Sequence, residues 1–126
     1  MSGREENIVR EFLDSFIEGD VAVSVNYLAE DASYYFNAWH EPITGVETLR
    51  ADFERQAAGW SGFHYDLLNI ASTATVVLIE RIDRGQSQGK DLAVHTVGVF
   101  EIDEAGKISS WRDYWDPKEV ETQRAG

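Results

Sequence analysis

The sequence predicts an α+β fold, in which helices from the first half pack on one face of an antiparallel sheet formed by the second half. The first half carries stripes of apolar residues at helical spacing, opened by capping residues. The second half carries four runs of β-branched and aromatic residues, separated by turns of Gly, Ser and Asp. Helices followed by strands are typical of α+β domains, and 126 residues suit a single domain over residues 1–126.

Two helices are expected at the amino-terminal end. Ser2 and Glu5 have the spacing of a capping box, and Gly19 is suited to end the helix that they open. Asp20 is expected to cap a short second helix that runs through Tyr27 and Leu28. The apolar stripe of the first helix consists of Ile8, Val9, Phe12, Leu13, Phe16 and Ile17.

An extended segment and a third helix are expected next. Ser33–Asn37 is rich in aromatic residues and is predicted to be a strand or extended turn. Thr44 and Glu47 repeat the capping-box spacing and predict a helix that ends at Gly59. Its inward residues are expected to be Val46, Leu49 and Phe53.

The second half is expected to form a meander of strands and a short closing helix. Polar and glycine-rich hairpin loops are predicted at Arg84–Gly89 and Asp103–Gly106, and the helix is predicted to start near Pro117. The predicted strands are Phe63–Ile70, Thr75–Asp83, Leu92–Ile102 and Ile108–Trp115.

Composition and charge narrow the expected partners. Eleven Lys and Arg residues against 23 Asp and Glu give a net charge of −12, which repels nucleic acid and anionic membrane surfaces. No stretch approaches the roughly 18 apolar residues that span a bilayer, and the polar start has no apolar signal core. Without cysteine there is no disulfide, thiolate nucleophile or cysteine zinc site. We therefore expect a cytoplasmic protein with a neutral ligand, and neither nucleic acid nor membrane as a partner.

Strand periodicity places three charged residues within two apolar rows. Successive side chains of a strand alternate between its faces, so residues two apart share a face. If both rows point to the concave side of the sheet, two carboxylates and one guanidinium meet in an apolar pocket. The two rows are Val77, Ile79, Arg81 and Asp83, and Trp111, Asp113 and Trp115.

The charged trio Asp83, Arg81 and Asp113 admits two interpretations. The first is an ordinary salt bridge, with both Asp side chains reaching water near strand ends. The second is an acid–base site, because like charges in one cavity resist simultaneous ionisation. One carboxyl then keeps its proton while the other loses it, and the same residue type supplies an acid and a base.

Other chemistries are poorly supported by the sequence. Gly59–Gly62 hints at a nucleophile elbow, but Phe63 stands where the final glycine belongs. The histidines His40, His64 and His95 lack the paired spacing of metal ligands. No glycine-rich phosphate loop or dinucleotide fingerprint is present. We therefore expect an enzyme without a cofactor or metal.

Four short motifs lie in order along the chain. They are Tyr35-Phe36-Asn37 followed by Pro42 and Gly45, Glu80-Arg81-Ile82-Asp83, Gly98-Val99-Phe100, and Trp111-Arg112-Asp113-Tyr114-Trp115-Asp116. With these motifs the sequence resembles the limonene-1,2-epoxide hydrolase family, and their order and separations agree from about Tyr34 to Asp116. Each motif is weak alone, but the ordered set, in which three motifs each contribute a polar residue to one site, makes a specific match.

The resemblance implies a fold and a set of roles. The fold is nuclear-transport-factor-2-like, a cone of curved sheet closed by helices, and is usually a homodimer. Asp113 resembles the base that activates a water held by Tyr35 and Asn37. Asp83 resembles the acid that protonates the epoxide oxygen, with Arg81 between the two carboxyl groups. The residues expected to line the substrate pocket are Trp111, Trp115, Val94 and Thr96.

The resemblance implies an epoxide hydrolase that adds water to a neutral, apolar epoxide and gives a vicinal diol. Three alternatives remain open at this point. An epoxide-opening cyclase would use a hydroxyl of the substrate as nucleophile. A ketosteroid-isomerase-like enzyme or polyketide cyclase would share the fold, but residues 4–18 lack the oxyanion-binding Tyr of the isomerases. A non-catalytic binding domain would have pocket carboxyl groups with ordinary pKa values near 4.

Overall fold

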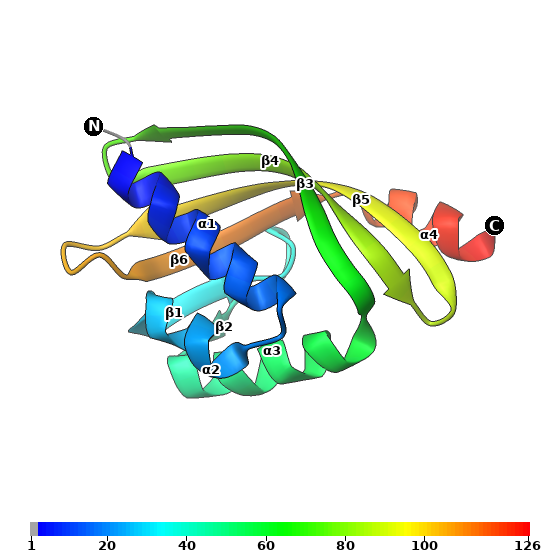
Figure 1. Ribbon diagram of the computed structural model, residues 1–126, viewed down its shortest axis with the longest axis horizontal. Coiled ribbons are helices and arrows are strands. Elements are labelled where there is room, and N and C mark those ends of the chain that lie inside the picture. Colours follow the sequence, from blue (N-terminus) through cyan, green and yellow to red (C-terminus); the bar gives the residue numbers. More distant parts are fainter. Residues whose placement is uncertain (1–2) are drawn as a thin grey trace.

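The frame of the protein is a curved sheet of six strands in the order β2-β1-β6-β5-β4-β3, seen in a computed structural model that describes residues 3–126 (Figure 1). Strands β3 to β6 form an antiparallel meander, and β1 joins it by running parallel to β6. The strands are β1 (Leu28–Tyr35), β2 (Ile43–Thr44), β3 (Ser61–Thr73), β4 (Val76–Ser87), β5 (Lys90–Ile102) and β6 (Ile108–Trp115).

Helices cover the concave side of the sheet and one of its ends. The longest helix, α1, crosses the hollow of the sheet, and α4 lies beside β5 at the far end (Figure 1). The helices are α1 (Gly3–Ile17), α2 (Val21–Ser24), the 3-10 turn η1 (Val25–Tyr27), α3 (Val46–Gly59) and α4 (Pro117–Ala125). This arrangement confirms the predicted α+β class with the amino-terminal helices packed in a curved sheet.

Aromatic side chains hold α1 and α3 to the sheet. Phe12 of α1 is fully buried, and its ring centroid lies 6.1 Å from Phe53 of α3 and 5.2 Å from Trp111 of β6. Aromatic pairs at such distances stabilise by about 0.5–1.5 kcal/mol beyond area burial. The predicted stripe of α1 therefore forms the core, whereas Ser2 of its predicted capping box lies outside the described residues.

The prediction that Asp20 caps a second helix is confirmed, but the predicted end of that helix is wrong. Asp20 caps α2, since its carboxylate accepts a hydrogen bond from the Val23 amide at 3.3 Å. The predicted helix reached Leu28, yet Leu28 begins β1, and the strand ends at Tyr35 and not at Asn37. The reason is tertiary: β1 pairs with β6, and this pairing overrides the weak local preference for helix.

The capping box predicted for the third helix is wrong. The residue before α3 is Gly45, and no side chain caps the helix. Thr44 belongs to β2, and its hydroxyl lies 3.3 Å from that of Ser33 on β1. The Thr44 side chain, which the spacing predicted to cap the helix, therefore contacts β1 instead.

The loop predicted at Arg84–Gly89 is mostly strand. β4 continues to Ser87, which pairs with Lys90, and the turn consists of Gln88 and Gly89 alone, both with positive φ. Two-residue turns of this kind match the twist of antiparallel strands. Ser87 is buried, and a Cβ on Gly85 would lie 2.9 Å from Trp60 Cε3. The serine and glycine that suggested a loop therefore pack within the strand.

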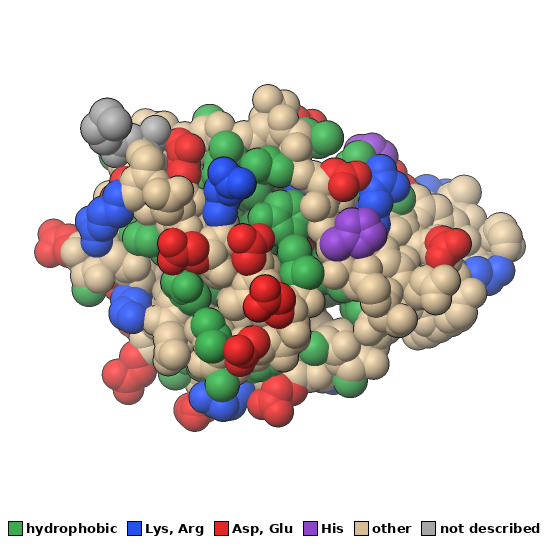
Figure 2. All heavy atoms as spheres, viewed as in Figure 1, with side chains coloured by type: hydrophobic (Ala, Val, Ile, Leu, Met, Phe, Trp, Pro, Cys, Tyr) green, Lys and Arg blue, Asp and Glu red, His purple; other side chains and the backbone are tan. Residues whose placement is uncertain are grey.

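Acidic side chains dominate the face formed by α1 and α2, with hydrophobic side chains between them (Figure 2). The acidic side chains on this face contribute to the net charge of −12. Among residues 3–126, no helix combines the length and apolar character that crossing a membrane requires.

Candidate active site

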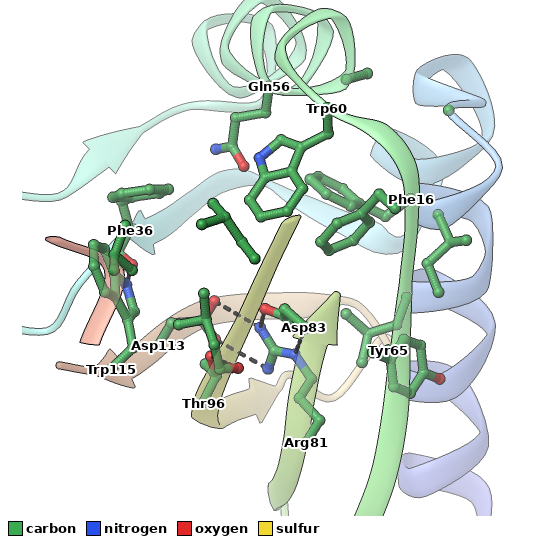
Figure 3. Close-up of a pocket in the computed structure, with 18 of the residues that line it drawn as sticks. Phe16, Phe36, Gln56, Trp60, Tyr65, Arg81, Asp83, Thr96, Asp113 and Trp115 are labelled. Atoms are coloured by element: carbon green, nitrogen blue, oxygen red, sulfur yellow. Dashed lines mark hydrogen bonds and ion pairs between the residues drawn. The ribbon is translucent and has the colours of Figure 1, made fainter. Parts of the chain in front are cut away.

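A cavity of about 540 Å³ lies between the concave face of the sheet and the ends of α1, α3 and α4. Most of its wall is aromatic or aliphatic, and Arg81, Asp83 and Asp113 lie together on the sheet side (Figure 3). Phe16 and Phe63 form part of the apolar wall, and Val120 and Arg124 of α4 close one end. Apolar cavities of this size with a few convergent polar groups are typical of small-molecule sites.

Arg81 joins the two carboxylates of this cavity. Its Nε and Nη2 donate to Asp83 at 2.8 and 3.2 Å, and its Nη1 and Nη2 donate to Asp113 at 3.3 and 2.8 Å. The guanidinium is therefore bidentate to both acids, a geometry that a lysine cannot reproduce. The faces predicted from strand alternation are confirmed, because Arg81 shares its row with fully buried Val77 and Ile79.

The guanidinium reaches Asp113 by crossing a strand. Arg81 lies on β4 and Asp113 on β6, with β5 between them. At the crossing point β5 carries Gly98, which pairs directly with Asp113. A Cβ on Gly98 would lie 2.8 Å from Arg81 Nη1 and 3.0 Å from Asp113 Oδ1. Gly98 is thus a site residue that strand periodicity did not single out, although it begins one of the family motifs.

Asp113 receives a third donor from Trp111. The indole N–H donates to Oδ1 at 2.7 Å, and Asp113 is only 5 % exposed. Burial raises the pKa of Asp113 above its ordinary value of 3.8, and the Asp83 charge acts in the same direction. The charge and hydrogen bonds of Arg81, and the hydrogen bond from Trp111, act to lower this pKa. Burial prevails because a charged carboxylate loses more hydration than these donors restore.

Arg81 keeps its charge at every pH of interest. Burial acts to lower its pKa, but the nearby carboxylates of Asp113 and Asp83 outweigh burial and raise that pKa above the ordinary value. One fixed positive charge therefore faces two carboxyl groups. Such a trio is electrically neutral when one carboxyl holds a proton, and burial favours this state.

The side-chain partners of Asp83 and Asp113 are all hydrogen-bond donors. All hydrogen bonds that Asp83 and Asp113 make with side chains of residues 3–126 come from N–H donors, namely those of Arg81 and Trp111. These donors offer no acceptor for a carboxyl O–H. The trio can therefore donate a proton to a ligand at one carboxyl and accept one at the other.

Tyr34 and Gln56 form a second polar group in the cavity. Both line the cavity, and Gln56 Nε2 lies 3.4 Å from the Tyr34 hydroxyl oxygen. Burial raises the pKa of Tyr34 well above its ordinary value, and the Asp113 charge adds to that shift. The Tyr34 hydroxyl is therefore neutral, and its ring lies 4.4 Å from that of Trp111, which hydrogen-bonds Asp113. The aromatic run of the sequence contained Tyr34 without distinguishing it from its neighbour.

Tyr35 and Asn37, predicted to hold a water together, do not line the cavity. Tyr34 pairs with Trp111 and Tyr35 with Arg112, so the two tyrosines point to opposite faces of the sheet. Asn37 is buried, but its Nδ2 donates to the Trp115 carbonyl at 2.9 Å. The prediction assumed one extended segment, whereas β1 ends at Tyr35 and the chain then turns.

The other predicted site residues do meet in the cavity. They come from three neighbouring strands, which explains why residues far apart in the sequence share one wall. Val94 and Thr96 are nearly buried on β5, and the indole of Trp115 donates to the Phe36 carbonyl at 2.7 Å. The predicted residues that line the cavity are Arg81, Asp83, Val94, Thr96, Trp111, Asp113 and Trp115. Within residues 3–126 no group of three or more His, Asp or Glu side chains has the arrangement of a metal site.

Solved structures with the same fold include one clear relative. A Mycobacterium tuberculosis epoxide hydrolase described as LEH-like is 26% identical to this chain, with a TM-score of 0.84 over 98% of this chain and 92% of its own. The epoxide hydrolase/cyclase-like enzyme SalBIII, of pyran ring formation in salinomycin, is 18% identical, with a TM-score of 0.84 over 94% and 95%.

A third structure, from Shewanella putrefaciens and described as a SnoaL-like polyketide cyclase, is 15% identical, with a TM-score of 0.87 over 96% of each chain. At this identity it shows the fold alone, which is the nuclear-transport-factor-2-like fold that the resemblance implied. The family model of the limonene-1,2-epoxide hydrolase catalytic domain matches residues 4–125. The matched range includes Arg81, Asp83, Gly98 and Asp113. The chain belongs to the limonene-1,2-epoxide hydrolase family.

Proposed function

We propose that this protein is an epoxide hydrolase that adds water to a neutral, apolar epoxide and releases a vicinal diol. The observation that carries the proposal is one buried guanidinium held between two carboxyl groups in an apolar cavity. Family membership and the 26% identical epoxide hydrolase support the same activity. The acidic surface favours a neutral substrate over an anionic one.

The proposed mechanism has a single chemical step. Asp113 removes a proton from water as the water oxygen bonds to an oxirane carbon. The carbon–oxygen bond of the ring breaks, and Asp83 transfers its proton to the departing oxygen. The diol forms without a covalent enzyme intermediate, and a proton passes from Asp113 back to Asp83 to restore the resting state. The step balances with water alone, so it requires no cofactor.

Arg81 keeps the two carboxyl groups in unlike protonation states. It faces both, and its charge compensates one ionised carboxylate but not two. Holding water and epoxide in line also removes much of the entropic barrier. General acid–base catalysis of this kind contributes about 10²–10⁴-fold to a rate.

Tyr34 takes the water-holding role in this proposal, in place of Tyr35. Tyr34 lines the cavity and its ring lies 4.4 Å from that of Trp111, which hydrogen-bonds Asp113, whereas Tyr35 is not part of the cavity wall. Asn37 then has a supporting role, because its amide ties the chain after β1 to the end of β6. Trp115, Val94 and Thr96 would contact the apolar part of the substrate.

A single turnover in heavy-oxygen water with excess enzyme tests the mechanism. The one-step route places the label in the diol and none in the protein. Label recovered in Asp83 or Asp113 by peptide mass spectrometry would instead show a covalent ester intermediate and defeat the one-step mechanism. A panel of cyclic and terpenoid epoxides with chiral analysis of the diols would define the substrate.

An epoxide-opening cyclase is the second candidate. The size of the cavity, about 540 Å³, leaves room for a substrate whose own hydroxyl folds back onto the oxirane. A hydroxy-epoxide incubated with the enzyme separates the two activities. A hydrolase gives a triol that carries one oxygen from heavy water, whereas a cyclase gives a cyclic ether with no label.

The proposal includes a homodimer, which the family resemblance implies. The outer face of the sheet exposes Leu78, Val97 and Tyr114 on the adjacent strands β4, β5 and β6, with exposed fractions of 40%, 37% and 40%. A second copy of the chain would cover this row through a two-fold symmetric contact. Light scattering on the wild type should give a dimer mass, and Val97→Glu should shift it toward the monomer. A monomer mass for the wild type at high protein concentration would contradict the proposed homodimer.

A further inference from the structure

The cavity wall at the end of α3 carries a glutamine amide with a fixed orientation. Gln56 Nε2 donates to Asp52 Oδ2 at 2.8 Å and lies 3.4 Å from the Tyr34 hydroxyl oxygen. A carboxylate can only accept, so the amide nitrogen must face buried Asp52. Asp52 also pairs with Arg55, which holds its carboxylate in place. The amide oxygen Oε1 is therefore directed away from Asp52.

Two polar atoms of this wall have no partner in the protein. Within residues 3–126, Gln56 Oε1 receives no hydrogen bond and the Trp60 indole N–H donates none, although both residues line the cavity. Every fully buried side-chain nitrogen or oxygen in the described part of the chain does have a partner. These two atoms consequently remain accessible, one as an acceptor and one as a donor, at a wall that is otherwise mostly apolar (Figure 3).

We infer that the substrate carries a hydroxyl group remote from its oxirane, and that Gln56 and Trp60 bind this hydroxyl. The inference rests on the proposed epoxide hydrolase function and specifies its substrate class. A hydroxyl donates and accepts, so it can satisfy both atoms, whereas a ketone or an ether would leave Gln56 Oε1 unpaired. A purely apolar epoxide would displace water from both atoms and pair with neither.

Gln56 and Trp60 then determine specificity. A site that hydrogen-bonds a substrate hydroxyl discriminates strongly against the analogue that lacks it, because buried polar groups are left unsatisfied. Discrimination of about 10- to 100-fold in kcat/KM is expected for one such group in a partly open cavity. The same contacts place the oxirane, since the amide and the charged trio lie on different walls of the cavity (Figure 3).

A matched pair of epoxides tests the inference. The 1,2-epoxides of p-menth-1-ene and of α-terpineol differ by one hydroxyl that is remote from the oxirane. The wild type should have the higher kcat/KM for the hydroxylated epoxide. Gln56→Met preserves the length of the side chain and should lower that value about 10- to 100-fold, while the value for the other epoxide changes less than about threefold. Gln86→Met is the matched control, since Gln86 is exposed and hydrogen-bonds Asp91 outside this cavity.

A binding measurement tests the hydroxyl site independently of epoxide hydrolysis. α-Terpineol and p-menth-1-ene, which have no oxirane, can be titrated by quenching of the tryptophans in the cavity. The alcohol should bind the wild type more tightly, and Gln56→Met should remove the difference. Should Gln56→Met unfold, as judged by circular dichroism, Trp60→Phe serves as the second variant and should weaken binding of the alcohol alone.

The outcomes are distinct. Equal binding and equal turnover of the paired compounds by the wild type would overturn the inference and leave the proposed hydrolase intact. Preferential binding of the alcohol that is lost in Gln56→Met, without hydrolysis of any epoxide, would support the hydroxyl site and overturn the proposed function.

Discussion

The indole N–H of Trp111 donates to Asp113 Oδ1 at 2.7 Å, from two positions earlier on the same face of β6. Arg81 supplies the remaining two hydrogen bonds to this carboxylate. Trp111 is itself packed between Phe100, with ring centroids 5.2 Å apart, and Tyr34, at 4.4 Å. The aromatic core therefore fixes the direction of the proposed catalytic base, and Trp111 is more than a wall of the pocket.

Replacing Trp111 by Phe should move the acid limb of the pH profile. The substitution keeps an aromatic ring but removes a donor that lowers the pKa of Asp113. That pKa should rise, and because the base must be ionised, the acid limb of kcat/KM should move to higher pH. Loss of the hydrogen bond should also lower the maximal rate about tenfold.

Trp115→Phe is the matched control for this experiment. The Trp115 indole donates to a backbone carbonyl, that of Phe36, and not to a carboxylate. The acid limb of kcat/KM for Trp115→Phe should lie at the same pH as that of the wild type. Equal shifts in both variants would show that general disturbance of the cavity, and not the hydrogen bond to Asp113, causes the change.

Asp113→Asn and Asp83→Asn should each reduce kcat about 10²–10⁴-fold while the fold is preserved. Each removes one partner in the proton transfer but keeps the size of the side chain. Steady-state kinetics and circular dichroism measure the two effects. Asp66→Asn, on an exposed pair with Arg84, should remain near wild type. An active Asp113→Asn variant would defeat its assignment as the base.

Tyr34→Phe and Tyr35→Phe should differ in activity. Removing the Tyr34 hydroxyl takes away a polar group of the cavity that Asp113 also lines, and should lower kcat about tenfold or more. Tyr35 points to the other face of the sheet, so Tyr35→Phe should have little effect on kcat. The reverse order of effects would restore the role that the sequence motif implied for Tyr35.

Gly98→Ala should damage the site from within the sheet. The added methyl would lie 2.8 Å from Arg81 Nη1 and 2.9 Å from Phe100 Cε1, so the guanidinium must move. Overpacking of this kind costs about 1–3 kcal/mol of stability, and activity should fall at least tenfold. Gly59→Ala is the control, because its Cβ would meet nothing within 4 Å. Unchanged kcat in Gly98→Ala would show that the Arg81 geometry tolerates displacement.

Asp113 should make stability depend on pH in a defined direction. Its pKa is raised in the folded protein above the 3.8 of an ordinary Asp, so between these two values the folded state binds more protons. The contribution of Asp113 to the free energy of unfolding is therefore largest below 3.8 and is lost as pH rises through the folded pKa.

Urea unfolding at several pH values checks this direction. Asn does not titrate, so the free energy of unfolding of the wild type relative to Asp113→Asn should fall as pH rises from 3.8 and then level off. A relative stability that increases over that range would mean that pairing with Arg81 outweighs burial.

The sequence by itself determined the fold class, the helical stripe of α1 and the faces of β4 and β6. These features depend on local periodicity, and periodicity decides which side chains share a face. Strand alternation alone therefore places Arg81 and Asp83 in one row with Val77 and Ile79. The family motifs added roles to these residues, but motif spacing assumes regular strands.

Only the tertiary structure decided which polar residues actually meet. The end of β1 at Tyr35 turns Tyr34 and not Tyr35 toward the cavity, because pairing with β6 fixes the register. Gly98 matters only because Arg81 must cross β5 to reach Asp113. Likewise, the Gln56 amide oxygen is directed toward the cavity because the amide nitrogen donates a hydrogen bond to buried Asp52. Such contacts join distant segments, and no local pattern in the sequence encodes them.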